Sequence, residues 1–244
     1  MSAPKIGVVM FDAATDALSV LRAVELAGGT PVKLHPRTTV APDLADLPLV
    51  ILPGGFSYGD YLRAGALAAT QPIMRVLEDA VKAQELTLIG LGNGFQVLTE
   101  TGLLPGGFVA NDVPVFDHTE VDLVVEENTT AITSAYDTGE HIRLVLKGAF
   151  TQYTATQEEL ETLENRGNVI IRATESAAGS VNNIAGISSD DGLVLGLTAS
   201  PEYAIEPGFG TDHADGPGLG VDGQGLFVSV VRTAIAAKNG VVSE

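Results

Sequence analysis

Short apolar runs alternate with segments of helical periodicity in the first half of the chain. The apolar runs predict strands at Lys5–Phe11, Pro31–Leu34, Leu49–Leu52 and Leu86–Leu91. The helical spacing predicts helices over Asp16–Ala27, Tyr58–Ala69 and Pro72–Gln84, and a short helix that ends near Gly102. Because strands and helices alternate with short connections, this half predicts a parallel sheet with helices on both faces.

The second half contains more short strands and fewer helices. Apolar or partly alternating runs predict strands in Thr119–Thr133, Ile142–Leu146, Val169–Arg172, Asn183–Ile187 and Val194–Leu197. An acidic helix is predicted over Thr156–Arg166, with Thr156 as its N-cap and Glu159 three residues later. The last helix is predicted at Gln224–Ala237, after a loop rich in Gly, Asp and Pro at Pro207–Gly223. No repeat or linker divides the chain, so we expect one domain over residues 1–244.

The charge balance narrows the range of partners. Asp and Glu number 31 against 13 Lys and Arg, which gives a formal net charge of −18. A surface this acidic repels phosphate backbones and anionic lipids, so nucleic-acid and membrane partners are not expected. The excess fits solubility or salt adaptation, and also a basic protein partner. With no apolar stretch of membrane-spanning length and only a short apolar run near the N-terminus, we expect a soluble cytoplasmic protein.

The chain contains no cysteine. Disulfides, thiolate metal sites and a thiol nucleophile are therefore excluded. Asp212, His213 and Asp215 could offer ligands to a divalent cation, but an acidic solvated loop is the more common role of such a segment, so we expect no metal and no cofactor.

Two glycine turns follow two of the predicted strands. "PGGFSYG" (Pro53–Gly59) follows Leu49–Leu52, and "GLGNG" (Gly90–Gly94) completes Leu86–Leu91. Sites in parallel sheets lie beyond the carboxyl ends of the strands, so the two turns together favour a shared site. Neither turn fits a nucleotide loop, because Phe95 stands where the dinucleotide fingerprint needs glycine and the first turn lacks Gly-Lys-Ser/Thr.

The second turn has the layout of a strand–turn–helix elbow of the kind that presents a nucleophile in α/β hydrolytic enzymes. Its central position is Gly92, which has no side chain. A third segment, "LTASPEYAIE", follows the strand at Val194–Leu197 and carries Ser200 and Glu202 around a proline. That spacing can direct both side chains into one pocket, although Ser-Pro-Glu is also an ordinary turn.

Four motifs in order resemble one family. They are "LPGGFSYGDYLRAGALAA" (Leu52–Ala69), "GLGNGFQVLTETGLLPG" (Gly90–Gly106), "GSVNNIAGI" (Gly179–Ile187) and "SPEYAIE" (Ser200–Glu206). The chain resembles, over nearly its whole length, the PurQ-type glutaminase subunits of phosphoribosylformylglycinamidine (FGAM) synthase in purine biosynthesis. The resemblance implies the α/β class I glutamine amidotransferase (flavodoxin-like) three-layer fold with a mostly parallel central sheet.

The resemblance also implies a mechanism. In this family a cysteine on the elbow attacks the glutamine amide, a histidine moves the proton and a glutamate orients the histidine. Backbone N–H groups hold the oxyanion, and the released ammonia passes to an ATP-dependent synthetase subunit.

When the family's motifs are aligned with this sequence, the residues that carry out the reaction are not retained. The nucleophile position is Gly92 and the base position is Ser200, while the orienting acid Glu202 remains. The family's His-Gly-Glu-Gly stretch corresponds to Lys147–Phe150, and "FDAATD" (Phe11–Asp16) departs from the usual Phe-Pro-Gly. The oxyanion or ligand-binding elements are retained as Gly54, Gly55 and Asn93. Because several motifs differ together, natural loss explains the pattern better than an engineered single substitution.

The sequence therefore predicts a glutaminase-inactive subunit with a binding, structural or regulatory role. Its expected partner is a synthetase subunit of the FGAM synthase type or an active paralogue, and glutamine is a candidate ligand. The retained glycine motif suggests partner contacts through Phe56, Tyr58 and Arg63. One alternative is a repurposed enzyme that uses Ser200 and Glu202, or a loop with Asp212, His213 and Asp215. Another is an amidotransferase subunit that works with free ammonia.

Overall fold

The computed structural model describes residues 3–40, 44, 46–111, 115–175, 179–207 and 220–238. Its first half contains β1 (Lys5–Val9), α1 (Ala17–Leu26), β2 (Thr30–Leu34), β3 (Leu49–Leu52), α2 (Ala66–Ala69), α3 (Pro72–Lys82), β4 (Thr87–Leu91) and α4 (Asn93–Glu100). Its second half contains β5 (Gly107–Val109), β6 (Asp117–Val125), β7 (His141–Gly148), β8 (Gln152–Thr154), α5 (Gln157–Arg166), β9 (Val169–Ala173), η2 (Val181–Asn183), β10 (Ile184–Ser188), β11 (Val194–Leu197), η3 (Pro201–Tyr203) and α6 (Gln224–Lys238).

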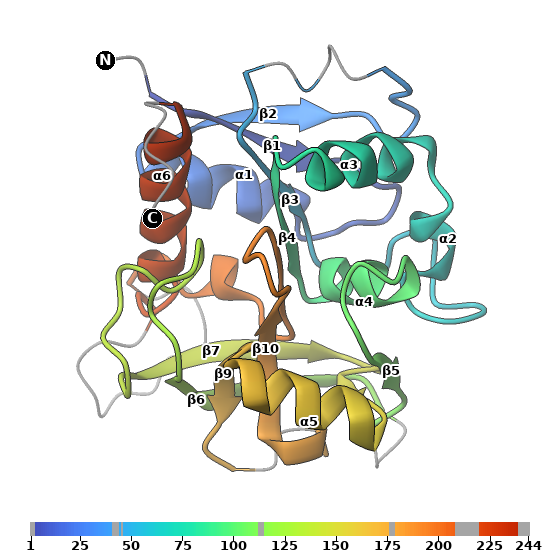
Figure 1. Ribbon diagram of the computed structural model, residues 1–244, viewed down its shortest axis with the longest axis vertical. Helices are drawn as coiled ribbons and strands as arrows, with labels where there is room; N and C mark the ends of the chain where they lie inside the picture. The colour runs from blue at the N-terminus through green and yellow to red at the C-terminus, as the bar shows by residue number, and fades with distance from the viewer. Residues whose placement is uncertain are drawn as a thin grey trace.

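A 9-stranded sheet organises the molecule, in the order β2-β1-β3-β4-β11-β10-β9-β6-β7 (Figure 1). The strands β2, β1, β3, β4 and β11 run parallel to one another. The remaining strands extend the sheet through antiparallel pairs. The α/β class with a large, mostly parallel sheet is confirmed. The topology also places β11 directly beside β4, with Leu197 opposite Leu91, so both strands end at the same level.

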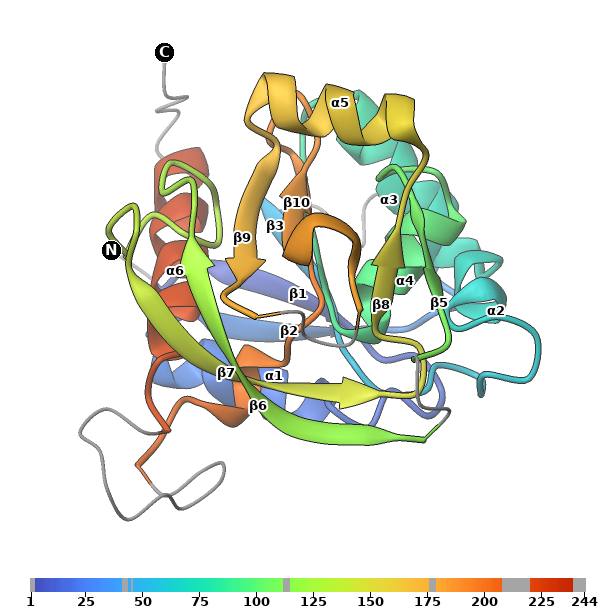
Figure 2. The same cartoon turned by 90° about the horizontal axis from the view of Figure 1, so that it is seen from below.

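Helices cover both faces of the sheet and produce three layers (Figure 1). Alternate strand residues face opposite sides, as the pleat requires. On β3, Leu49 and Ile51 pack in one core with α1 and α6, whereas Val50 and Leu52 pack in a second core with α3, α4 and α5. Figure 2 shows α5 at the end of the molecule that holds β9 and β10.

The helix predicted over Tyr58–Ala69 is wrong over most of its length, because only Ala66–Ala69 is helical. Tyr58, Gly59 and Gly65 have positive φ values of 60°, 80° and 81°, which a right-handed helix does not accommodate. Gly65 must also stay small, since a Cβ there would lie 2.7 Å from the backbone nitrogen of Val97. The segment is therefore an exposed turn that packs on α4.

The other predicted elements agree in type, with shifted ends. The strand predicted within Thr119–Thr133 begins and ends earlier, at Asp117–Val125. The short pair β5–β8 was not predicted, because three-residue strands carry little periodic signal. Asp212, His213 and Asp215 lie outside the described residues. No helix in the described ranges is long and apolar enough to cross a membrane.

Candidate functional site

The elbow between β4 and α4 lies at the centre of the candidate site. Gly92 has φ 52° and ψ −114°, outside the regions that residues with side chains prefer. Its N–H donates to the Leu197 carbonyl at 2.8 Å, which ties the elbow to the end of β11. Glycine is also required two residues before and two residues after Gly92. A Cβ on Gly90 would collide with the Gly94 carbonyl, and a Cβ on Gly94 would collide with the Leu52 carbonyl. Close backbone packing thus fixes the turn.

The space above Gly92 would accept a side chain. A Cβ on this residue would lie 3.6 Å from both the Gly54 Cα and the Ser200 Oγ, which are ordinary van der Waals contacts. For a Cβ, only the backbone conformation is unfavourable here. The elbow therefore has the shape to present a side chain and presents none.

Ser200 and Glu202 follow β11 and enter the site from a second strand. The Ser200 N–H donates to the Val145 carbonyl at 2.7 Å, which links this segment to β7. Glu202 is fully buried, and neither of its carboxyl oxygens has a hydrogen-bond partner among the described residues. Burial and the nearby Asp16 carboxylate raise the pKa of Glu202 to about 8. Its carboxyl group is therefore largely neutral at pH 7.

Asp16, Lys147 and Tyr203 form a charged cluster beside Ser200. Asp16 is fully buried, and its Oδ1 accepts from the Lys147 Nζ at 2.5 Å and the Tyr203 hydroxyl at 2.8 Å. The Lys147 ammonium also lies 4.5 Å from the centroid of the Tyr203 ring. Burial lowers the pKa of Lys147, but the hydrogen bond and charge of Asp16 outweigh it and leave the pKa raised. Lys147 is therefore a cation and not a base.

Asn93 braces the elbow against two neighbouring segments. Its Oδ1 accepts from the Ser57 N–H at 3.1 Å, and its Nδ2 donates to the Gln96 Oε1 at 2.7 Å. Gln96 in turn donates to the Phe150 carbonyl at 2.5 Å, in the connection between β7 and β8. The first glycine turn, α4 and this connection are thus held together by one chain of amide hydrogen bonds.

The first glycine turn approaches the elbow closely. A Cβ on Gly54 would collide with the Asp16 carboxylate, and one on Gly55, where φ is 119°, would collide with the Thr15 nitrogen. Among the described residues, no acceptor bonds the backbone N–H of Gly55 or of Asn93. These unused donors agree with the expected oxyanion role, which stays a prediction.

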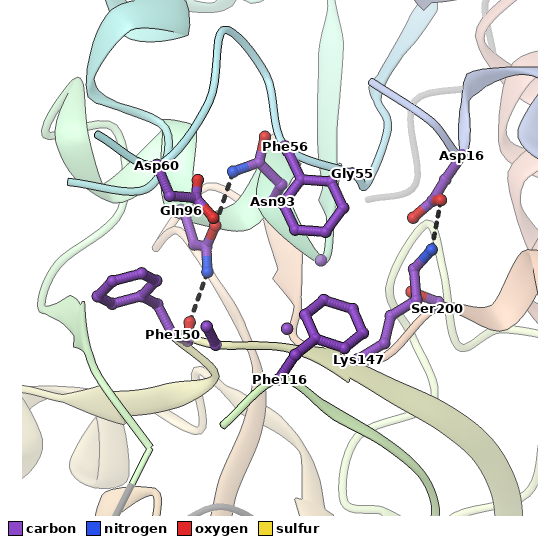
Figure 3. Close-up of a pocket in the computed structure, with 13 residues that line it drawn as sticks. Asp16, Gly55, Phe56, Asp60, Asn93, Gln96, Phe116, Lys147, Phe150 and Ser200 are labelled. Atoms are coloured by element: carbon purple, nitrogen blue, oxygen red, sulfur yellow. Dashed lines mark hydrogen bonds and ion pairs between the residues drawn. The ribbon is translucent and has the colours of Figure 1, made fainter. Parts of the chain in front are cut away.

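These segments enclose one pocket (Figure 3). It is lined by Asp16, Gly55, Phe56, Asp60, Gly92, Asn93, Gln96, Phe116, Lys147, Gly148, Ala149, Phe150 and Ser200. No histidine is among these lining residues. Burial raises the pKa of the Asp60 carboxyl, and Asp60 Oδ1 has no partner in the described part of the chain. The same part contains no group of three or more His, Cys, Asp or Glu residues that could hold a metal ion.

The structure brings together most of the sequence-predicted site residues. Gly55, Asn93, Gly92 and Ser200 line the pocket, with Gly54 directly behind. Glu202 lies close enough to Asp16 for their charges to interact but does not line the pocket.

The predicted partner contacts occupy different environments. Phe56 lines the pocket. Tyr58 packs edge-on against Phe11 with a centroid distance of 6.3 Å. Arg63 is paired with Glu100 at 2.6 Å.

Sequence reasoning missed the ionisable residues of the pocket lining, which are Asp60 and the Asp16–Lys147 pair. The sequence did contain a signal for Asp60, because this acidic residue directly follows the glycine turn that comes after the predicted strand Leu49–Leu52. Asp16 and Lys147 are 131 positions apart, and no local pattern connects them.

Comparisons with known proteins show which family the chain resembles. The family model for the CobB/CobQ-like glutamine amidotransferase domain matches residues 3–215. Phosphoribosylformylglycinamidine synthase subunit PurQ of Leifsonia xyli is 42% identical over 233 residues, covering 95% of this chain and 98% of the relative. The chain belongs to the PurQ family. The PurQ subunit of Corynebacterium jeikeium is 41% identical over 232 residues, covering 95% of this chain and 99% of that protein.

A solved structure also resembles this chain in both sequence and fold. PurLQS from Thermotoga maritima contains a chain that is 34% identical, with a TM-score of 0.82, and the match covers 94% of this chain and 98% of that one. A glutamine amidotransferase from Thermotoga maritima is 13% identical with a TM-score of 0.55, over 83% and 77% of the two chains. At that identity the likeness concerns the fold alone.

Proposed function

We propose that this chain is a PurQ-type subunit of FGAM synthase in purine biosynthesis that lacks glutaminase activity. The observation that carries the proposal is Gly92, which stands without a side chain at the elbow and lines the pocket. The chain contains no cysteine that could replace the missing nucleophile.

The remaining groups support this proposal because none of them is an activated nucleophile. A serine hydroxyl attacks an amide only when a general base removes its proton. Near Ser200, Glu202 is largely neutral at pH 7 and has no hydrogen-bond partner in the described chain. Lys147 is protonated and bonded to Asp16. The unused N–H groups of Gly55 and Asn93 can hold a carbonyl oxygen but cannot cleave the amide.

The surface next to the site supports a binding role with a synthetase partner. Tyr61 and Leu62 are 88% and 75% exposed in the turn that follows the first glycine motif. Large exposed apolar side chains in one segment are typical of protein contact surfaces. Since the similar Thermotoga structure is of PurLQS, we expect a PurL-type synthetase subunit to be the partner.

A glutaminase assay tests the inactivity directly. Ammonia release from glutamine is measured for the purified chain, alone and with the synthetase subunit from the same source. The expected result is no release above the protein-free control in either case. Turnover that Ser200→Ala abolishes would overturn the proposal and favour a serine-based enzyme on the same scaffold.

A further inference from the structure

A cavity of about 360 Å³ lies outside the elbow pocket, between α5 and the end of β10. It shares no lining residue with the pocket above Gly92. Leu103 and Leu163 contribute apolar side chains to its lining, and Asn168 and Ser188 contribute polar ones. A cavity of this size has room for a small organic ligand, because an apolar cavity of about 150 Å³ already accepts a benzene molecule.

Two polar side chains of this lining are buried and have unused hydrogen-bonding atoms. Ser188 is 6% exposed and Asn168 is 9% exposed. The Ser188 Oγ has no hydrogen-bond partner among the described residues. The Asn168 side chain is held there only through its Nδ2, which donates to Asp190 at 2.6 Å, so its Oδ1 is also unused. Because buried polar atoms are normally hydrogen-bonded, these two oxygens are available to a ligand that donates to them.

The two side chains belong to one cross-strand pair. The Ser188 N–H donates to the Asn168 carbonyl at 2.8 Å, which continues the antiparallel pairing of β10 with β9. Directly opposite residues of an antiparallel pair point to the same face, with Cβ atoms about 5 Å apart. A single group that carries several N–H donors can therefore reach both side chains.

The charge of the lining favours a cation. Glu158, Glu159 and Asp190 line the cavity, and no Lys or Arg does. Asp190 is paired with Arg166, and the Glu159 carboxylate accepts the capping hydrogen bonds of Thr156. Glu158 has no ion pair within the described part of the chain. A bound cation would therefore meet one carboxylate that is not yet neutralised and two oxygens that have no donor.

We propose that this cavity binds a primary alkylammonium ion. The ammonium group donates to the Ser188 Oγ and the Asn168 Oδ1, and the Glu158 carboxylate supplies the countercharge. The alkyl chain lies against Leu103 and Leu163. A primary ammonium group has three N–H donors, whereas a quaternary ammonium ion of the same charge has none. Because the site shares no residue with the elbow pocket, the proposal does not depend on the loss of glutaminase activity.

Nuclear magnetic resonance titration of the full chain with pentylamine, which is protonated at neutral pH, tests the proposal. We expect saturable shifts of the backbone amides of residues 158–168 and 188–190. Pentanol and pentyltrimethylammonium are matched probes, because the first lacks the charge and the second lacks the N–H donors. Each is expected to bind at least about tenfold more weakly, since it loses the charge-assisted hydrogen bonds. Equally tight binding of either matched probe, or no saturable shift with pentylamine at millimolar concentration, would overturn the assignment.

Variants separate this site from a general attraction of cations to an acidic protein. Ser188→Ala removes one acceptor, and we expect it to weaken pentylamine binding about tenfold while the binding of pentyltrimethylammonium stays unchanged. Glu158→Gln is expected to weaken the binding of both cations. Glu161→Gln removes the same charge from an exposed position of α5 outside the lining and is expected to leave both unchanged.

Equal weakening by the two glutamine variants would show non-specific attraction and reject the site. Circular dichroism and thermal melting check that each variant is folded before titration. Because Glu158 is exposed, Glu158→Gln still decides the question if Ser188→Ala does not fold.

Discussion

At the scale of single residues, the elbow has a well-defined backbone and no side chain at Gly92, the position where we propose that the reactive group is absent. The backbone of Gly92 has the sharp geometry of an elbow, and its neighbours leave ordinary contact distances for a Cβ. Glu202, the proposed orienting acid, is buried close in sequence to the buried Ser200, and no histidine lines the pocket. The two positions therefore differ in energy. Glycine relieves backbone strain at the elbow, whereas the Glu202 carboxyl group is buried without a hydrogen-bond partner among the described residues.

Gly92→Ala should destabilise the fold. A side chain at φ 52°, ψ −114° is expected to cost about 1–3 kcal/mol in the free energy of unfolding, since there is room for the methyl group and backbone strain is the main term. Urea denaturation measures the change. Gly107→Ala is the control, because its Cβ would meet nothing within 4 Å and its φ lies outside the left-handed region. Equal losses for the two variants would contradict the strain argument.

Glu202 should make stability depend on pH. Its pKa rises from an ordinary 4.5 to about 8 on folding, because of burial and Asp16, so the folded state binds more protons than the unfolded state between these values. The free energy of unfolding should therefore fall as pH rises through this window, by up to about 1.4 kcal/mol per pH unit from this group. Glu202→Gln should remove that slope in urea titrations at several pH values.

The exposed Glu85 provides the control for this measurement. Glu85→Gln makes the same side-chain change at an exposed position, so a change in the pH profile that appears in both variants would not be specific to the buried Glu202. A Glu202→Gln profile that matches the parent would show that Glu202 is not the group responsible.

At the scale of elements, α5 illustrates how a local signal can specify a helix end. Thr156 caps the helix through its hydroxyl, which accepts from the Glu159 N–H, and the Glu159 carboxylate accepts from the Thr156 N–H. Leu160 and Leu163 then attach the helix to the core. The segment Tyr58–Gly65 shows the opposite case, in which helical spacing was overridden by residues with positive φ.

Thr156→Ala should destabilise the protein by about 0.5–2 kcal/mol, because the N-terminal turn of α5 loses its side-chain acceptor. Chemical denaturation checks this value. Thr162→Ala, at an exposed position inside the same helix, should be neutral or slightly stabilising because alanine has the higher helix propensity. If both variants lose the same stability, the capping box does not stabilise the helix end.

At the scale of the whole molecule, the pocket and the exposed turn lie on one continuous stretch of chain. The first glycine motif supplies Gly55, Phe56 and Asp60 to the pocket and then continues into the exposed Tyr61 and Leu62. Tyr61 and Leu62 do not line the pocket, so replacing them tests the proposed docking of a synthetase subunit without changing the pocket lining.

Replacing Tyr61 and Leu62 together by serine should weaken association with the synthetase subunit at least about tenfold, since large apolar side chains dominate interface energies. Calorimetry with the partner from the same source measures the affinity. Leu18→Ser is the control, because Leu18 is 66% exposed on α1, in a different segment of the chain. Unchanged affinity for the double variant would place the interface elsewhere.

The sequence by itself determined much of the order of helices and strands, and it determined which reactive side chains the site does not contain. Uniformly apolar strands, glycine turns and a capping box are local patterns, and local propensities suffice to read them. The absence of cysteine and the glycine at position 92 are also properties of the sequence alone. They exclude a thiol nucleophile whatever the fold.

Only the tertiary structure decided what surrounds the empty elbow. The parallel pairing of β11 with β4 brings Ser200 to Gly92, and the contact of Lys147 with Asp16 joins segments 131 positions apart. Several segments together bury the carboxyl oxygens of Asp16, Asp60 and Glu202 that have no hydrogen-bond partner in the described part of the chain. Long-range pairing and burial are not encoded in any single stretch, because they arise from the packing of the whole sheet and its layers.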